Sequence, residues 1–240
     1  EQNDFLIEYS VKGYISSLYN LANTYRNLKQ YKEALKTLDK LDSLQTNKLI
    51  ITSKFLSAYA FYLSNNLRLL IYILDKDFKQ AYESYKSIKH QYISQKDHID
   101  TQVVYEHLIL VIRVLVEFKD FKQALKLSNI IINDASFKKR ADIVSYIRLL
   151  NLIIHFELKN EFSLEYFSTS TKNYLKRKNR LYKTENEVIH FLIAYEKENL
   201  IVLNKINTKL KKLKNDPFEK SMFTLFDFQN WVEKKITAIK

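Results

Sequence analysis

The 240-residue chain contains one glycine, one proline and no cysteine. A sheet protein of this size needs many tight turns, and those turns usually contain glycine or Asn-Gly pairs. Hydrophobic residues make up 46% of the chain, which is too apolar a composition for intrinsic disorder. These features together predict an all-α fold. The lack of cysteine also excludes disulfides, thiolate nucleophiles and cysteine-ligated zinc.

Long apolar runs are missing too. No run approaches the roughly 20 residues that a bilayer-spanning helix needs, so we expect no membrane insertion. Leu149–Phe156 is among the longest, and Asn151 and His155 interrupt it. The absence of cysteine fits a cytoplasmic protein, which is the localisation we expect. The chain begins at Glu1 without an initiator Met or a signal-peptide pattern, which predicts the C-terminal part of a longer protein.

Motifs for catalysis and cofactor binding do not occur. A single glycine cannot build a glycine-rich phosphate loop, and there is no nucleophile-elbow motif. None of the five histidines stands four residues from another or belongs to a zinc motif such as H-E-x-x-H. We therefore expect no enzyme activity, no cofactor and no metal. A catalytic pair assembled between helices would leave no such spacing.

The chain does contain a repeated pattern of an aromatic residue, lysine, Glu or Gln, and alanine. Its three copies are Tyr31–Ala34, Phe78–Ala81 and Phe121–Ala124. Each copy lies between two amphipathic stretches, after a short polar break. The aromatic residue can fold back on the preceding helix, and alanine suits the closest approach of two antiparallel helices. The pattern therefore predicts repeated pairs of helices.

The first copy belongs to a longer motif. Leu18, Leu21, Ala22 and Tyr25 share one helix face, and the second helix follows it. The stretch 18–44 resembles a tetratricopeptide repeat (TPR), with Ala22 where the motif usually has glycine. The later copies depart from it: Arg68 stands where the motif has Leu, and the copies are 47 and 43 residues apart rather than about 34. The resemblance implies a TPR-like right-handed superhelix.

Helical periodicity predicts about ten to eleven antiparallel helices in one continuous solenoid that covers residues 1–240. We expect a break near Asn65-Asn66, and we expect Pro217 to open the last helix. Five polar residues are expected to take the place of glycine at the junctions: Asn47, Asp97, Ser136, Asn160 and Asn199. The expected helices span residues 12–27, 31–44, 48–74, 78–94, 99–118, 121–133, 138–158, 161–178, 182–196, 199–214 and 218–238.

The TPR resemblance also implies a concave groove lined by the first helix of each pair. In the first repeat the implied groove positions are Ser16, Tyr19, Asn23, Arg26 and Asn27. Asn23 stands where peptide-binding TPR domains carry Asn for the backbone or carboxylate of the ligand. Tyr19 stands where those domains usually carry Lys, which argues against a carboxylate clamp. In the third copy, Arg113 takes the place equivalent to Asn23.

A polar stripe marks the expected helix 138–158. Arg148, Asn151 and His155 follow helical spacing on an otherwise apolar segment. Unpaired burial would cost roughly 1–3 kcal/mol per group, so we expect the stripe to pair with a neighbouring helix or to face a ligand-binding groove. The segment Arg148–Glu185 resembles the C-terminal region of a group of uncharacterised bacterial TPR-containing proteins. That resemblance implies the same fold and carries no mechanism.

The net charge of +12 is concentrated in the second half of the chain. Residues 1–120 hold 16 basic and 14 acidic residues, whereas residues 121–240 hold 23 and 13. A basic patch, with tyrosines interleaved, is suited to phosphates or bases. Its residues are Arg177, Lys178, Arg180 and Lys183. Cations that favour a helix dipole are the alternative explanation of this run, and AT-rich coding is the alternative for the lysine content.

The sequence thus predicts a non-catalytic scaffold whose groove binds a peptide or a partner protein of unspecified identity. Nucleic-acid binding by the basic half is a less favoured alternative. A ligand-sensing domain of a longer signalling protein is a third, in which binding changes the curvature of the superhelix.

Overall fold

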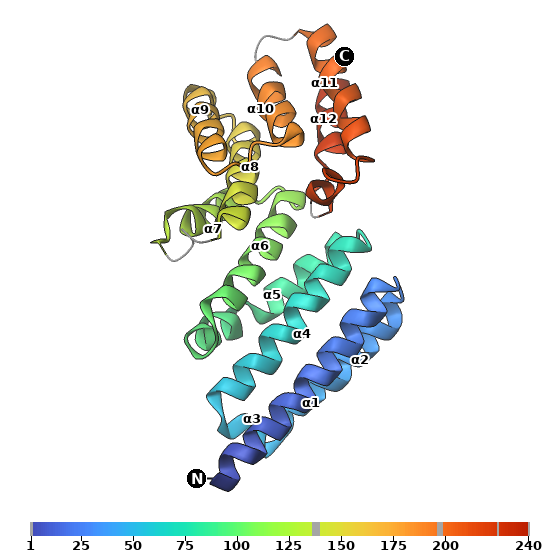
Figure 1. Ribbon diagram of the computed structural model, residues 1–240, viewed down its shortest axis with the longest axis vertical. Helices are drawn as coiled ribbons and strands as arrows, with labels where there is room; N and C mark the ends of the chain where they lie inside the picture. The colour runs from blue at the N-terminus through green and yellow to red at the C-terminus, as the bar shows by residue number, and fades with distance from the viewer. Residues whose placement is uncertain (1, 136–139, 196–198, 225, 240) are drawn as a thin grey trace. The chain divides into compact units, whose positions relative to one another are not determined.

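The computed structural model describes residues 2–135, 140–195, 199–224 and 226–239 (Figure 1). These residues form twelve α-helices and short 3-10 turns, which confirms the all-α prediction. The α-helices are α1 (Gln2–Asn27), α2 (Tyr31–Ser43), α3 (Lys48–Thr52), α4 (Lys54–Leu74), α5 (Phe78–Gln95), α6 (Thr101–Glu117), α7 (Phe121–Asn133), α8 (Ala141–Glu157), α9 (Glu161–Arg177), α10 (Lys183–Tyr195), α11 (Leu200–Leu213) and α12 (Phe228–Thr237).

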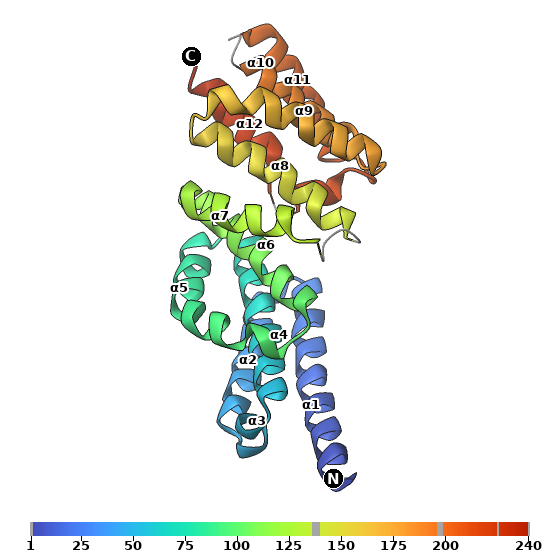
Figure 2. The same ribbon diagram turned by 90° about the vertical axis from the view of Figure 1, so that its left-hand side faces the viewer.

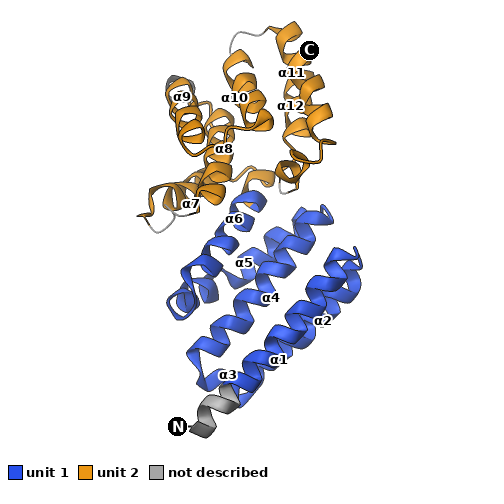
Figure 3. Cartoon of the chain, viewed as in Figure 1, with its two compact units in different colours: residues 1–114 blue, residues 115–240 orange. Residues whose placement is uncertain are grey.

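The chain divides into two compact units, residues 1–114 (unit 1) and 115–240 (unit 2), as Figure 3 shows. In unit 1, α1 packs on α2, and α4 packs on α1, α2 and α5. In unit 2, α8 packs on α7 and α9, α10 packs on α8, α9 and α11, and α11 packs on α12. Within each unit, helices therefore pack mostly on their sequence neighbours, as antiparallel pairs (Figures 1 and 2).

The three copies of the aromatic–alanine pattern all begin helices, as predicted. Tyr31, Phe78 and Phe121 are the first residues of α2, α5 and α7. The alanine three positions later is fully buried in each copy. In the first copy, Ala34 packs with Ala22 of α1 in one core cluster, where the small side chains permit close helix approach.

Five helix ends share one kind of turn, although it contains no glycine. The residue that makes this turn has a φ between 54° and 61° in every case. These residues are Lys29, Lys76, Lys119, Lys159 and Asn179. The next N–H donates to the carbonyl five residues earlier, as from Gln30 to Tyr25, which is the long bond of a Schellman motif. At four of these five helix ends, lysine therefore adopts a left-handed conformation in which glycine is usually found.

The polar residues expected at junctions have other roles. Asn47 and Asn199 cap the starts of α3 and α11 through their side chains. Asp97 lies in a 3-10 turn, and Asn160 precedes α9 with a negative φ. Ser136 lies outside the described residues. The prediction that these residues replace glycine is therefore wrong for the four described, since none of them has a positive φ. For Asn47 and Asn199 the reason is that their side chains are used to cap a helix start.

Two predicted boundaries are also wrong. The expected helix 48–74 breaks at Ser53, whose side chain accepts from Leu56 N and starts α4, rather than near Asn65-Asn66. Asn65 is buried and donates to a carbonyl of its own helix instead. Pro217 does not open the last helix: it lies in a turn, and α12 begins at Phe228. The last helix is capped by Asp227, a signal that the proline obscured.

Candidate functional site

The predicted groove positions near the end of α1 form a polar cluster. Arg26 Nε donates to Asn23 Oδ1 at 2.9 Å, and Arg26 Nη2 donates to Asn27 Oδ1 at 2.7 Å. Asn23 and Arg26 are half-buried, and Asn27 is exposed. One guanidinium therefore holds both amide side chains by their oxygens. The amide N–H groups are the part of Asn23 and Asn27 that a peptide carbonyl would meet.

Tyr19 lies on the same helix, half-buried against the core of unit 1. Burial raises the pKa of Tyr19, the charge of Glu106 on α6 raises it further, and Arg26 lowers it. One turn away, Ser16 Oγ lies 3.0 Å from Tyr59 Oη of α4. The predicted positions on α1 therefore lie beside α4 and within electrostatic range of α6.

Arg113 lies apart from that cluster. Only 4% of the residue is exposed, and its guanidinium carbon lies 4.8 Å from the ring centre of Phe78, the first residue of α5. The side chain is thus packed between α6 and α5, where a partner would reach little of it. As a groove residue Arg113 stays a prediction, although its burial leaves it less accessible than Asn23.

The polar stripe on α8 pairs with both neighbouring helices. Asn151 is buried, and its Nδ2 donates to Ser128 Oγ at 2.8 Å and to Asn129 Oδ1 at 3.2 Å, both on α7. His155 is also buried; it stacks on Phe167 of α9, with ring centres 4.4 Å apart. Burial lowers the pKa of His155, which keeps the imidazole neutral at pH 7. Helix pairing thus accounts for these two residues.

The structure brings the third stripe residue together with part of the basic patch. The guanidinium carbon of Arg148 lies 4.4 Å from the ring centre of Tyr174 on α9, and that of Arg177 lies 5.8 Å from the same ring. Lys178 is exposed at the end of α9. Lys183 begins α10, and its backbone N–H donates to Glu219. Of the four predicted patch residues, Arg177 shares the ring of Tyr174 with Arg148. The patch as a binding surface stays a prediction.

Sequence reasoning missed a cleft of about 320 Å³ beside α12 in unit 2. Its walls come from α12, the end of α8, the α6–α7 turn and the segment before α12. The lining includes the aromatic residues Phe121, Phe226 and Trp231 and the cations Lys119, Lys234 and Lys235. Trp231 is the only tryptophan of the chain, and a lone tryptophan three and four residues before two lysines was the available signal.

Fixed contacts hold Trp231 in that cleft. Its indole Nε1 donates to Glu157 Oε1 of α8 at 2.7 Å, and Lys235 Nζ pairs with Glu157 Oε2 at 2.7 Å. The ring also lies edge-on to Phe156 and Phe191, with centres 5.4 and 5.5 Å away. One carboxylate thus fixes two residues of α12, and the indole is oriented before any partner arrives.

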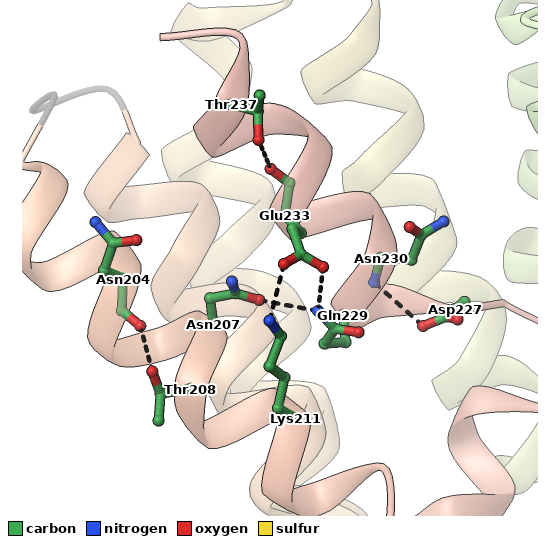
Figure 4. A network of polar contacts seen from close by, with 9 residues as sticks. All are labelled: Asn204, Asn207, Thr208, Lys211, Asp227, Gln229, Asn230, Glu233 and Thr237. Atoms are coloured by element: carbon green, nitrogen blue, oxygen red, sulfur yellow. Dashed lines mark hydrogen bonds and ion pairs between the residues drawn. The ribbon is translucent and has the colours of Figure 1, made fainter. Parts of the chain in front are cut away.

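The opposite face of α12 is fixed to α11 by a polar network (Figure 4). Gln229 Nε2 donates to Asn207 Oδ1 and to Glu233 Oε2, and Lys211 Nζ pairs with Glu233 Oε1 at 2.8 Å. Asp227 caps the helix by accepting from Asn230 N. These contacts set the rotation of α12 about its axis and direct its other face toward the cleft.

A metal-binding cluster and the buried histidine of unit 1 are two further candidates for a functional site. Among the described residues, no group of three His, Cys, Asp or Glu side chains could hold a metal ion. His107 is buried in unit 1, stacked on Tyr92, with Nδ1 2.7 Å from Asn66 Oδ1. Burial lowers the pKa of His107 to about 3, so this histidine is a neutral core residue.

Comparison with known proteins gives no family for this chain. No protein-family model, curated protein or solved structure matches it. Within the described ranges, none of the helices combines the length and the apolar character that crossing a bilayer would require.

Proposed function

We propose that the chain is a non-catalytic, cytoplasmic protein-interaction module with a TPR-like right-handed superhelix. Two features of the packing support this. The aromatic–alanine pattern begins three helices, α2, α5 and α7. In addition, α4 packs on both helices of the preceding pair, α1 and α2, and α10 packs on both α8 and α9. Such contacts between adjacent pairs are what stacked helical repeats need to share a core.

The observation that carries the binding function is the cleft around Trp231. Tryptophan and other aromatic residues dominate the energetics of protein interfaces, chiefly in pockets that exclude water. A volume of about 320 Å³ lies at the low end of the range of ligand pockets, and it accommodates a large side chain of a partner. The bond from Trp231 to Glu157 fixes the indole in place, which lowers the entropy lost on binding.

The charges of the cleft indicate the chemistry of its occupant. Three lysines and three carboxylates line it, so its formal charge is balanced. Two of those carboxylates are already held by cations: Glu157 by Lys235, and Asp227 by Lys214 at 2.5 Å. The cleft therefore favours a peptide segment with a large apolar side chain that enters between the aromatic rings. The amide groups of Asn23 and Asn27 on α1 offer a second, polar contact surface for a partner.

Nucleic-acid binding by the basic half is supported less well. Three of the five lysines in α11 and at its C-terminal cap are paired: Lys209 with Glu187, Lys211 with Glu233 and Lys214 with Asp227. Each pair removes a cation that a nucleic-acid backbone would need to displace counterions. The excess of lysine in the sequence is therefore larger than the number of unpaired lysines that unit 2 offers to a nucleic acid.

Site-specific photo-crosslinking tests the proposed function. A photoreactive amino acid replaces Asn230, an exposed residue of the cleft, and in a matched control it replaces Lys205, an exposed residue of α11. In cells that make the protein, position 230 should crosslink to a protein partner that survives nuclease treatment, and position 205 should not. Adding Ala238→Phe at the cleft rim should abolish the crosslink without removing a core contact.

Equal crosslinking at both positions, or crosslinks to nucleic acid alone, would overturn the assignment of the cleft. Circular dichroism of each variant guards against a loss of fold. Replacement of Arg26 and Asn23 by Ala, in the same assay, separates a role of the α1 surface from that of the cleft.

A further inference from the structure

Two arginines lie over the ring of Tyr174 on α9: Arg177 of the same helix and Arg148 of α8. The guanidinium carbons of Arg148 and Arg177 lie 4.4 and 5.8 Å from the centre of its ring. Their separation therefore cannot exceed the sum of those two distances. Arg148 is half-buried and Arg177 is exposed, so the pair spans the boundary between protein and solvent. Guanidinium stacking on an aromatic face is favourable, and it occupies the face of each group rather than its N–H donors.

Neither guanidinium has an anionic partner within the described residues. Arg148 and Arg177 take part in none of the ion pairs of the structure, and Arg148 Nε is buried without a hydrogen-bond partner. Burial lowers the pKa of Arg148, Tyr174 acts in the opposite direction, and Arg177 lowers it further. Two like charges next to one ring, one of them desolvated, are unfavourable until an anion joins them.

We propose that Arg148 and Arg177 form a binding site, seated on Tyr174, for a single phosphate group. Guanidinium groups bind phosphate through paired N–H···O bonds, and each charge-assisted bond is about twice as strong as a neutral one. Two guanidiniums match the double charge of a phosphate monoester better than the single charge of a carboxylate. An anion here would accept from donors that have no acceptor in the protein.

A single phosphate group suits this site better than a nucleic-acid backbone. A backbone tract needs a row of unpaired cations along a groove, with strong dependence on salt. Arg180, the next arginine of the patch, is instead close enough to Glu185 to oppose the rise that burial causes in the pKa of that carboxyl. The ligand is therefore inorganic phosphate or one phosphorylated side chain. The proposal uses none of the residues of the Trp231 cleft, so either can fail without the other.

The test is a titration of the full chain with inorganic phosphate and, separately, with O-phosphoserine, at constant ionic strength. The readout is the ¹H–¹⁵N signal of the arginine Nε–H groups, assigned from the variants. The Nε–H signals of Arg148 and Arg177 should shift in a saturable way. Arg177→Gln removes one exposed guanidinium and should raise the Kd about tenfold, the loss of one charge-assisted bond.

Lys178→Gln is the matched control, because it removes one positive charge from the adjacent exposed position. It should change the Kd less than twofold. Equal weakening by Arg177→Gln and Lys178→Gln would show diffuse attraction and overturn the site, as would shifts that never saturate. Binding of phosphate without O-phosphoserine would assign free phosphate as the ligand, and tighter binding of O-phosphoserine would assign a phosphorylated side chain. Arg148→Lys keeps the charge without the planar fork, and it should weaken binding as much as Arg177→Gln.

Discussion

The two units treat a half-buried arginine in opposite ways. In unit 1, Arg68 of α4 reaches two carboxylates of α2: its Nη2 lies 2.9 Å from Asp39 Oδ1 and 2.7 Å from Asp42 Oδ2. In unit 2, Arg148 of α8 has the ring of Tyr174 and a second cation, Arg177. Burial disfavours both charges, yet the carboxylates reverse its effect on the pKa of Arg68 and raise it.

The difference separates two roles of a half-buried arginine between packed helices. The ion pairs of Arg68 join α4 to α2. Arg148 has no such structural partner among the described residues. Proteins tolerate buried charges when they are paired, and an unpaired one points to a ligand. In unit 1 the ion pairs of Arg68 stabilise the packing of two helices, whereas in unit 2 Arg148 remains available to bind an anion.

Unit 2 also contains a buried carboxylate without a cation in contact. Glu185 is 2% exposed, and its Oε2 has no hydrogen-bond partner. Burial raises the pKa of Glu185 to about 7, with a contribution from Glu219, while Arg180 acts in the opposite direction. Glu219 caps α10 from a distant segment, because its carboxylate accepts from Lys183 N and from both Thr184 N and Oγ1. Among its described residues, unit 2 therefore contains both a half-buried arginine without an anionic partner, Arg148, and a buried carboxyl without a cation in contact, Glu185.

The largest expected effect concerns Glu185. Its folded-state pKa of about 7 exceeds the ordinary value of 4.5, so between these pH values the folded protein holds a proton that the unfolded chain has released. Stability should therefore fall as pH rises from about 5 to 8, by about 3 kcal/mol from this residue. Glu185→Gln should remove this decrease. Urea unfolding, followed by the fluorescence of Trp231 in the same unit, measures it.

Glu165→Gln is the control, since it neutralises an exposed carboxyl of α9 and should leave the pH dependence unchanged. A wild-type stability that stays level from pH 5 to 8, or a Glu185→Gln variant that keeps the slope, would contradict the assignment. Either result would mean that the charge of Glu185 is compensated in the folded protein.

The next effect tests the two arginines directly. Arg68→Met keeps the apolar stem and leaves two carboxylates without their cation, so it should lower the free energy of unfolding by about 2 kcal/mol. Arg148→Met removes a desolvated charge and a cation–π contact together. Its effect should stay within about 1 kcal/mol, because the two changes oppose each other. Hydrogen exchange of α2 and α4, compared with α8 and α9, measures both.

Lys36→Met controls for the loss of an exposed pair, since Lys36 and Glu33 are both solvent-exposed, and it should lower the free energy of unfolding much less than Arg68→Met does. If Arg148→Met destabilises as much as Arg68→Met, then Arg148 is a structural residue. The contrast between the units, and with it the phosphate site, would then fail.

The sequence predicted the helices well where their signals are local. Helical periodicity and the aromatic–alanine pattern located the starts of α2, α5 and α7, because a small buried residue at a helix crossing is visible in the residue type. Helix ends were harder to predict. Pro217 led us to predict that the last helix begins there, whereas the residue that caps its actual start is Asp227.

The candidate sites depend on contacts that sequence spacing does not show. Arg148 and Tyr174 are 26 positions apart, and Trp231 and Glu157 are 74 apart, so only the packing of α8 on other helices brings them together. Ion pairs are equally hidden from the sequence: Lys209 and Lys211 of α11 pair with acids on α10 and α12. Composition gives the number of charged residues, and only the fold shows which of them form ion pairs.

The smallest effect tests what the two units share, the left-handed lysine that ends a helix. Lys29 in unit 1 and Lys159 in unit 2 have φ values of 59° and 55°, a conformation that costs an L-residue about 1–2 kcal/mol and glycine nothing. Glycine loses more backbone entropy on folding, which offsets part of the gain. Lys29→Gly and Lys159→Gly should therefore each stabilise their unit by up to about 1 kcal/mol, whereas Lys29→Ala and Lys159→Ala should give no gain. Hydrogen exchange of α1 and α8 measures the two increments. Equal increments would show that the units share one turn and differ only in how they treat buried charge. A glycine variant no more stable than its alanine counterpart would show that the turn holds its lysine without strain.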